Sequence, residues 1–359
     1  MPPLKPGKSV PPLLLNHTLS INISNRDLLG RRNGLFKQQV WTKTARSAPG
    51  LVEMVKAVAK RMVASAVLRL PWGARETIYE ALCGRLGTTE TMARAAARAG
   101  ITGISASGRW GTIQSAASDR AILPTYARTG DWARQTHGAL AEFFSDAGGT
   151  YLDIGANIGL TTIPVARNPL VNCFAFEPEP TNFANLQENV QRNAMHRNVV
   201  LHRLALLDRA GFVPFGLSSD GNLGDHRVVT AVHCGRRTIE VAAVPLDTLR
   251  IPITGQLAIK VDTQGAEPAV ISGGMKTFAN ANLVILEFSP YMIDQLHGDP
   301  AIVYRYLTGF DRIALVEGES GEDLSFSSAI AGCMALQKIY ETCRHDRSAY
   351  FDVYARRNA

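Results

Sequence analysis

Tyr151–Gly159 has the sequence YLDIGANIG, in which an apolar run ends on Asp153 and two glycines follow. After Gly159 the pattern turns helical. A strand, a tight turn and a helix N-terminus in this order form the usual grip on a nucleotide-like cofactor in an open α/β sheet. Gly155 and Gly159 let the backbone approach a ligand closely and adopt torsion angles that other residues resist. This stretch therefore predicts a cofactor-binding α/β fold.

Strand and helix patterns alternate on the carboxyl side of this stretch, which indicates a mostly parallel sheet. Two antiparallel ribbons, 212–215 and 238–244, interrupt the alternation around a glycine-rich polar loop at 218–226. We therefore expect an α/β fold with a seven-stranded, mostly parallel, Rossmann-like sheet, helices on both faces and a late antiparallel hairpin. The predicted sheet strands are 150–154, 172–176, 199–204, 257–261, 283–288, 312–316 and 350–355, the last two separated by a loop.

The composition of the 359-residue chain, 46% hydrophobic and 19% charged, is sufficient to bury a substantial core. No apolar run reaches 18 residues, so no transmembrane helix is expected. The proline-rich N-terminus does not read as a secretory signal. The five cysteines are scattered and lack C-x-x-C spacing, which argues against a disulfide framework and a zinc site. We expect a cytoplasmic protein, and no metal site is predicted.

The positive charge of the chain is concentrated at its N-terminal end. Residues 1–100 hold 16 Lys and Arg against five Asp and Glu, a balance of +11, so the remainder carries −4 of the total of +7. We expect a disordered basic arm at 1–50, a helical N-terminal extension at 51–115 and the catalytic domain at 116–359. The basic region is either a solvated leader or a peripheral contact with the inner face of a membrane or another polyanion.

Three features come at the carboxyl ends of successive predicted strands, where an open α/β sheet binds its ligands. The first is the turn after Asp153. The second is Glu177, which can accept hydrogen bonds from both hydroxyls of a ribose but can equally cap the next helix. The third is the segment 259–267, IKVDTQGAE, in which Lys260 and Asp262 point to the same side of their strand, as site residues or as a structural pair.

From about Asp119 onward the chain resembles the FkbM family of S-adenosylmethionine-dependent methyltransferases. The resemblance implies a class I methyltransferase domain with S-adenosylmethionine as the cofactor. It also implies methylation of a hydroxyl on a sugar, glycan, glycolipid or polyketide-type small molecule. The matching segments are 153–159 (DIGANIG), 176–178 (FEP), 205–208 (ALLD), 259–262 (IKVD) and 265–267 (GAE).

Two positions depart from the family pattern. Thr263 and Gln264 stand where the family commonly has an aliphatic residue and a Glu, so one candidate carboxylate is lost. Pro164 falls in the helix after the glycine turn and is expected to shorten or kink it. Neither departure touches the residues expected to hold the cofactor.

The expected roles divide between cofactor binding and proton removal. Asp262 is the first candidate for a general base and Glu267 the second, while Lys260 orients Asp262 or an acceptor oxygen. Contact with the cofactor or a metal, or a structural role, are alternatives for Asp262. The expected cofactor-binding residues are Asp153, Gly155, Ala156, Asn157, Gly159, Glu177, Pro178, Ala205 and Leu206.

The polar loop and the end of the fifth strand supply further candidates. His226 and His233 are alternative bases, since a histidine titrates near neutral pH, or are ordinary loop residues. The loop that contains them is the best candidate for a lid and for acceptor selectivity. Ser289, Pro290 and Tyr291 either line the acceptor pocket or form a plain turn.

The sequence argues against three other functions. A nicotinamide-dependent dehydrogenase is disfavoured because Asn157 stands where the dinucleotide fingerprint has its second glycine. An RNA methyltransferase that uses the basic N-terminal region is disfavoured because the charge lies outside the catalytic domain. A catalytically silent binding module is disfavoured by the intact turn and Glu177. The expected partner is a small-molecule or glycan acceptor.

Overall fold

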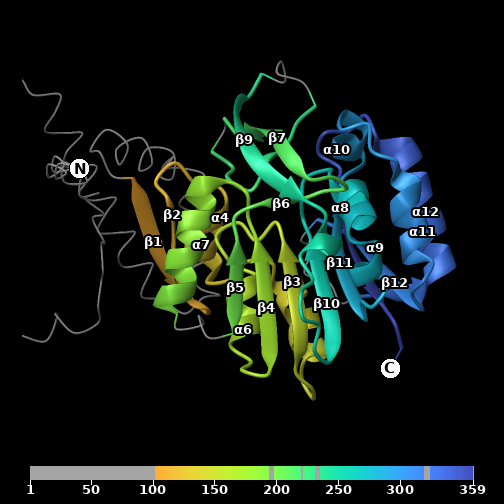
Figure 1. The fold of residues 1–359 in the computed structure, drawn as a ribbon, viewed down its shortest axis with the longest axis horizontal. Coiled ribbons are helices and arrows are strands. Elements are labelled where there is room, and N and C mark those ends of the chain that lie inside the picture. The colour runs from red at the N-terminus through yellow and green to blue at the C-terminus, as the bar shows by residue number, and fades with distance from the viewer. Residues whose placement is uncertain (1–101, 194–197, 220, 231–234, 319–323, 359) are drawn as a thin grey trace, which may run out of the picture.

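The computed structural model describes residues 102–358 except 194–197, 220, 231–234 and 319–323. The centre of this part is an eight-stranded mixed sheet with the order β13-β12-β14-β11-β10-β3-β4-β5 (Figure 1). The predicted arm at 1–50 and the predicted helical extension over 51–101 lie outside the described residues.

The sheet confirms the predicted α/β, Rossmann-like arrangement. Five neighbouring strands run parallel, and β14 inserts antiparallel between β11 and β12 to make the late hairpin. The strand count was wrong by one, because the three-residue β13 adds an eighth strand at the edge. The strands are β5 (Val199–His202), β4 (Val171–Phe176), β3 (Gly149–Ile154), β10 (Gln256–Val261), β11 (Leu283–Phe288), β14 (Phe351–Arg356), β12 (Arg312–Glu317) and β13 (Phe326–Ser328).

Helices cover both faces of the sheet, which explains why its central strands are mostly apolar. They are α4 (Ile122–Thr129), α5 (Arg134–Phe143), α6 (Thr162–Ala166), α7 (Pro180–Arg192), α8 (Glu267–Gly273), α9 (Met275–Phe278), α10 (Pro290–Gln295), α11 (Pro300–Leu307) and α12 (Ala329–Cys343). All six residues of β3 are buried. Successive side chains alternate between faces. Tyr151 packs with α5 and α6, while Leu152 packs with α8 and α11.

Of two predictions about connecting segments, one is confirmed and the other is wrong. α6 is only five residues long and has Pro164 at its third position, as expected for a proline in a helix interior. The loop predicted between the last two strands was wrong, because α12 occupies 15 residues of it. Ser328 caps this helix by accepting a hydrogen bond from the Ala331 amide, and Ala329, Cys333 and Leu336 are buried along one side.

A second, four-stranded sheet stands above the carboxyl ends of the parallel strands (Figure 1). It contains the two predicted ribbons, which are the antiparallel pair β7 and β9. The predicted third strand is divided, so that its last residues lead into this sheet. The strands are β6 (Ala205–Leu206), β9 (Arg237–Val244), β7 (Gly211–Leu217) and β8 (Arg227–Val228).

Residues 103–115, which the sequence placed in the helical N-terminal extension, belong to a β-hairpin instead. Its strands are β1 (Gly103–Gly108) and β2 (Gly111–Ala116). Asn189 of α7 binds both backbone groups of Gln114, at 2.7 Å from the amide nitrogen and 2.9 Å from the carbonyl oxygen. Ile113 is fully buried. The hairpin therefore packs into the core. Its contact with α7 joins two residues that are 75 positions apart in the sequence.

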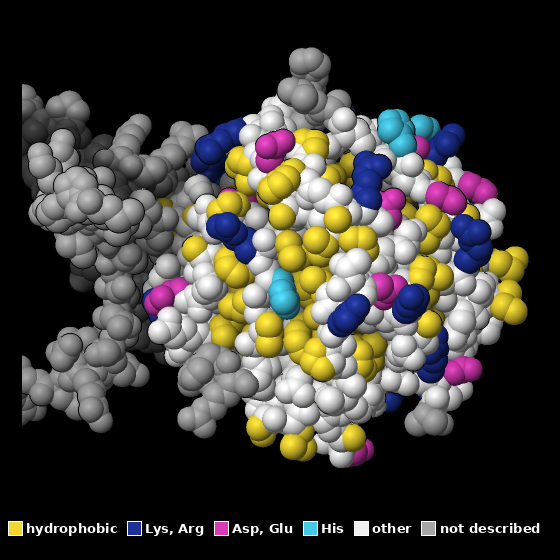
Figure 2. All heavy atoms as spheres, in the orientation of Figure 1, with side chains coloured by type: hydrophobic (Ala, Val, Ile, Leu, Met, Phe, Trp, Pro, Cys, Tyr) yellow, Lys and Arg dark blue, Asp and Glu magenta, His cyan; other side chains and the backbone are white. Residues whose placement is uncertain are grey.

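The surface of the described domain mixes both signs of charge. Figure 2 shows Lys and Arg interspersed with Asp and Glu over the face in view. Within the described residues, no helix is long and apolar enough to cross a membrane.

Candidate functional site

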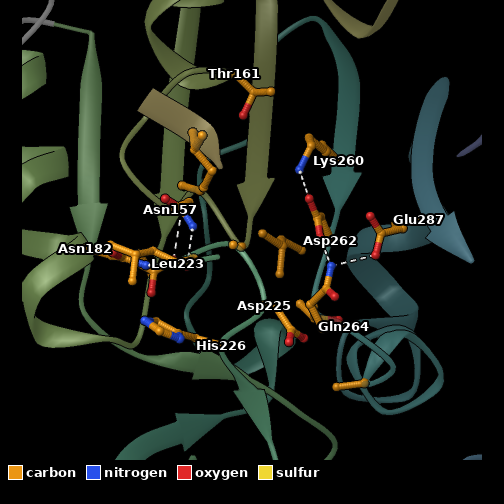
Figure 3. Close-up of a pocket in the computed structure, with 18 of the residues that line it drawn as sticks. Asn157, Thr161, Asn182, Leu223, Asp225, His226, Lys260, Asp262, Gln264 and Glu287 are labelled. Carbon is orange, nitrogen blue, oxygen red and sulfur yellow. Dashed lines mark hydrogen bonds and ion pairs between the residues drawn. The ribbon is translucent and has the colours of Figure 1, made fainter. Parts of the chain in front are cut away.

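A cavity of about 610 Å³ lies at the carboxyl ends of β3, β4, β10 and β11. Its size is that of small-molecule binding sites. Two groups of side chains face it from opposite sides (Figure 3). We call them the turn side, Gly155, Asn157, Glu177 and Asn182, and the charged side, Lys260, Asp262, Gln264 and Glu287.

The glycine turn follows β3 and forms the floor of the turn side. Gly155, Asn157 and Gly159 have φ values of +86°, +52° and +91°, in the left-handed region that glycine and asparagine tolerate best. A Cβ atom on Gly155 would lie 1.9 Å from the carbonyl oxygen of Asp262. Glycine is therefore required where the turn meets the end of β10.

Asp153 supports this turn from below. It is fully buried, and its Oδ2 accepts hydrogen bonds from the hydroxyls of Thr161 at 2.7 Å and Thr162 at 2.5 Å. Gly155, Ala156 and Asn157 line the cavity, whereas Asp153 and Gly159 do not. Asp153 thus joins the end of β3 to the start of α6 and acts on the site through the turn.

Glu177 lies at the end of β4 and lines the cavity next to Pro178. Its Oε2 accepts from the amide of Asn157 at 2.9 Å, and its Oε1 accepts from the amide of Glu179 at 2.8 Å. Burial raises the pKa of Glu177 to about 8, although the two amides oppose this shift. The helix cap is Glu179, whose carboxylate accepts from the amide of Asn182 at 2.6 Å. Glu177 therefore remains available to a ligand.

Two buried amide groups complete the turn side. The Nδ2 atoms of Asn157 and Asn182 both donate to the carbonyl oxygen of Leu223, at 3.0 and 3.1 Å. Their Oδ1 atoms have no hydrogen-bond partner among the described residues, and both residues line the cavity. Buried acceptors of this kind ordinarily have a partner. The turn side is thus suited to a ligand that carries O–H or N–H donors.

Leu223 belongs to the polar loop that the sequence singled out. The loop therefore contacts the turn side directly. His226 of the same loop lines the cavity, and its Nδ1 accepts a hydrogen bond from the Ser218 amide at 2.9 Å. Burial lowers the pKa of His226. The neutral ring thus carries its proton on Nε2 and acts as a donor, which argues against a general base. His233 lies outside the described residues.

The charged side is a chain of hydrogen bonds between four side chains (Figure 3). Lys260 Nζ lies 3.0 Å from Asp262 Oδ2. Gln264 Nε2 lies 2.9 Å from Asp262 Oδ1 and 2.6 Å from Glu287 Oε1. Burial opposes the charge of Lys260, but Asp262 and Asp153 outweigh it and raise the pKa of Lys260 above its usual range. These four side chains place carboxylates and an amide at the carboxyl ends of β10 and β11.

Glu287 is a site residue that the sequence reasoning missed. Burial, together with Asp262 and Asp352, raises the pKa of Glu287 well above its ordinary value. Glu287 pairs directly with Asp352 across the antiparallel strands β11 and β14. The available signal was one acid near the end of the apolar run LVILEF, which a purely structural strand rarely contains.

Glu267, the second candidate for the base, lies outside the cavity lining. It is 1% exposed, and its Oε1 accepts from the amide and hydroxyl of Thr263 and from the amide of Gly265, at 2.9 to 3.1 Å. Burial raises the pKa of Glu267 to about 7. Its position shapes the loop that follows β10, so Asp262 and Lys260 are the predicted pair that reaches the cavity.

The remaining predicted residues fall at the edges of the cavity. Ala205 and Leu206 line it beside Phe176 and Leu204. Ser289 lines it, but Pro290 and Tyr291 do not. Arg347, which the sequence reasoning did not select, lines it and lies over the ring of Tyr291, with 5.4 Å between the guanidinium carbon and the ring centre.

Comparison with known proteins finds a family model that matches part of the chain. Residues 153–313 match the family model described as the methyltransferase FkbM domain. The chain is also 31% identical over 135 residues to the hexuronic acid methyltransferase AglP of Haloferax volcanii. The match covers 38% of this chain and 54% of the relative. The chain thus spans about half the length of this curated relative.

Solved structures show weaker similarity. A precorrin-6Y C5,15-methyltransferase of Geobacter metallireducens matches with 13% identity and a TM-score of 0.33, over 63% of this chain and 88% of that chain. A putative rRNA methylase of Clostridium thermocellum matches with 11% identity and a TM-score of 0.35, over 64% of this chain and 97% of that chain.

Proposed function

We propose, from the match of residues 153–313 to the methyltransferase FkbM domain model, that the protein transfers a methyl group from S-adenosylmethionine to a hydroxyl of a sugar. The observation that carries the proposal is the division of one cavity into two sides. The turn side offers buried acceptors beside a glycine turn, and the charged side offers a carboxylate held by a lysine and an amide.

The turn side fits the chemistry of S-adenosylmethionine. In its ionised form Glu177 can accept hydrogen bonds from the two ribose hydroxyls, and the unpaired Oδ1 atoms of Asn157 and Asn182 can accept from further O–H or N–H groups. The apolar side chains of Phe176 and Leu206 provide a surface for a flat aromatic base. When bound, S-adenosylmethionine supplies an electrophilic methyl group on its sulfonium.

The charged side fits the removal of a proton from an alcohol. Asp262 is fixed by Lys260 on one oxygen and by Gln264 on the other, and the lone pairs that remain can accept the hydroxyl proton. As the acceptor oxygen gains the methyl group, its proton passes to Asp262 and then to water. Holding the oxygen in line contributes as much as the base, because an alcohol is a poor nucleophile at neutral pH.

The lining of the charged side supports a sugar as the acceptor. Besides the four residues that define it, polar side chains from β11 and β14 and from residues next to them line this side, including Ser289, Tyr350 and Asp352. Such groups match the many hydroxyls of a carbohydrate, whereas a polyketide skeleton calls for apolar walls. The relative described as a hexuronic acid methyltransferase supports the same class of acceptor.

Calorimetry and a transfer assay test the proposal in two stages. The full chain is titrated with S-adenosylmethionine, and we expect saturable binding to one site. The protein is then incubated with the labelled methyl donor and either a panel of sugars, sugar nucleotides and glycans or total RNA. Transfer to a carbohydrate supports the proposal. Transfer to RNA alone, or donor binding without any transfer, contradicts it, and absence of donor binding removes the premise of a methyl donor.

A further inference from the structure

His137 of α5 lies behind the glycine turn and joins it to a neighbouring loop. The ring is 5% exposed. Its Nδ1 lies 2.9 Å from Asp131 Oδ1, and its Nε2 lies 2.9 Å from the carbonyl oxygen of Leu160. Leu160 directly follows Gly159 and lines the cavity, as do Ala133 and Thr136 from the start of α5. One buried ring thus connects two walls of the site.

The carbonyl of Leu160 needs this contact because of a proline. Leu160 precedes α6, but in the i→i−4 pattern of an α-helix its carbonyl would accept from the amide of residue 164. Residue 164 is Pro164, which has no N–H to donate. The preceding carbonyl, of Gly159, is satisfied by the Ile163 amide at 2.9 Å. His137 therefore supplies the hydrogen bond that Pro164 cannot make.

Both partners of the His137 ring are hydrogen-bond acceptors. A backbone carbonyl never donates. Asp131 Oδ1 already accepts from Trp110 Nε1 at 2.6 Å and from the Trp132 amide at 2.9 Å. Burial by itself would raise the pKa of Asp131. The hydrogen bond to His137 and the charge of His137 have the larger effect, so the pKa of Asp131 is lowered. A lone pair on either ring nitrogen would face an oxygen lone pair, so each nitrogen must carry a proton.

We propose that His137 is held as a buried imidazolium that substitutes for the amide missing at Pro164 and so positions the cofactor-binding turn. It is a positioning residue, since it does not line the cavity. Its consequence for the methyl donor rests on the function proposed above. The link also accounts for a departure from the family pattern that the site itself left unexplained.

The charges around the ring are consistent with this state. Asp131 supplies the negative charge from the loop before α5. Arg109 in the turn between β1 and β2 contacts Asp131 at 3.5 Å but is largely exposed. Arg109 and Arg167 both lie over the Trp110 ring, which meets His137 edge-on at 5.2 Å. Tyr126, another neighbour of Asp131, stays neutral because burial raises its pKa to about 12.

Nuclear magnetic resonance tests the charge in the free wild-type protein. At neutral pH we expect both ring nitrogens of His137 to show an attached proton in a nitrogen–proton correlation spectrum. A His137→Gln variant assigns the signals by their loss. The exposed His345 gives a reference, because its ring protons exchange with water. A His137 ring with a single N–H overturns the imidazolium and, with it, the proposal.

A double-mutant cycle tests the link to Pro164. His137→Gln is expected to weaken donor binding about tenfold, the size of one hydrogen bond to a charged group. Pro164→Ala restores an N–H at residue 164, so His137→Gln combined with Pro164→Ala should bind the donor within about threefold of wild type. His345→Gln serves as the matched control and should leave binding unchanged.

The cycle also separates this proposal from the proposed function. The same four proteins are compared by their free energies of unfolding, which need no donor. The double variant should lose less stability than the two single changes predict together. If the wild type does not bind S-adenosylmethionine, the proposed function fails while the spectra and the unfolding cycle still decide the role of His137. A double variant as impaired as His137→Gln in both measurements overturns the link.

Discussion

The turn side and the charged side of the cavity are built in different ways. The turn side is made largely of backbone and buried amides, and its contacts come from the ends of β3 and β4 and the helices that follow them. The charged side is made of three ionisable side chains and one amide on β10, β11 and the segment after β10. Both face the same 610 Å³ cavity.

This difference suggests a division of tasks. Backbone groups are not altered by amino-acid substitution, and they bind a ligand without a loss of side-chain entropy. They therefore suit a ligand that is the same in every reaction. Side chains adjust with sequence and titrate, so they suit an acceptor and a proton. Four substitutions test this division.

The largest effect is expected from Asp262→Asn. The amide retains the shape of the side chain but cannot take a proton, so turnover should fall at least about 100-fold. Donor affinity should stay near that of wild type, because Asp262 lies on the charged side. Steady-state kinetics and calorimetry measure the two quantities, with the exposed Asp346→Asn as control. A collapse of donor affinity instead would place Asp262 in the donor site and merge the two sides.

The second effect is expected from Glu177→Ala on the turn side. Loss of a carboxylate that accepts from ribose hydroxyls should weaken donor binding about tenfold or more, while the domain remains folded. Turnover at saturating donor should change less. Glu188→Ala on the outer surface of α7 is the matched control. Unchanged donor affinity would remove Glu177 from the ribose contact.

A third, smaller effect is expected from Gln264→Asn. Gln264 has a φ of +56°, which asparagine tolerates, but the shorter side chain cannot reach both Asp262 and Glu287. We expect about a tenfold loss in the specificity constant for the acceptor, the value of a hydrogen bond to a charged group, without a change in donor affinity. Gln337→Asn on the surface of α12 is the control. An equal loss in donor affinity would contradict the separation of the two sides.

The fourth change acts on stability, because Glu267 supports the charged side without lining the cavity. Burial raises its pKa from the ordinary 4.5 to about 7 in the folded protein. The folded protein therefore binds more protons than the unfolded chain, and stability present below the unfolded pKa is lost as pH rises through 7. Relative to Glu267→Gln, the wild type should lose about 2.5 kcal/mol of unfolding free energy between pH 5 and pH 8.

Chemical denaturation at several pH values measures this difference. Glu177, with a pKa raised to about 8, shifts stability in the same direction in both proteins, so it cancels in the comparison. A stability difference that does not change with pH would show that Glu267 is ionised in the folded protein throughout this range.

Much of the turn side could be predicted because its signals are local. The pattern of β3, the two glycines around Asn157 and the acid that ends β4 are each read from a few adjacent residues. The period-two pattern likewise places Lys260 and Asp262 on one side of β10. α12 was missed although its signals were local too: Ser328 at its start and buried Ala329, Cys333 and Leu336 at helical spacing.

The strand, turn and helix of the turn side follow from the sequence alone, because backbone conformation depends chiefly on neighbouring residues. The distant groups that meet at the cavity are selected by the tertiary structure. Glu287 joins Gln264 across two strands, Asn189 binds the hairpin at Gln114, and His137 reaches Leu160 beside Pro164. A buried donor or acceptor must find a partner, but the choice of partner is made by packing between elements far apart in the chain.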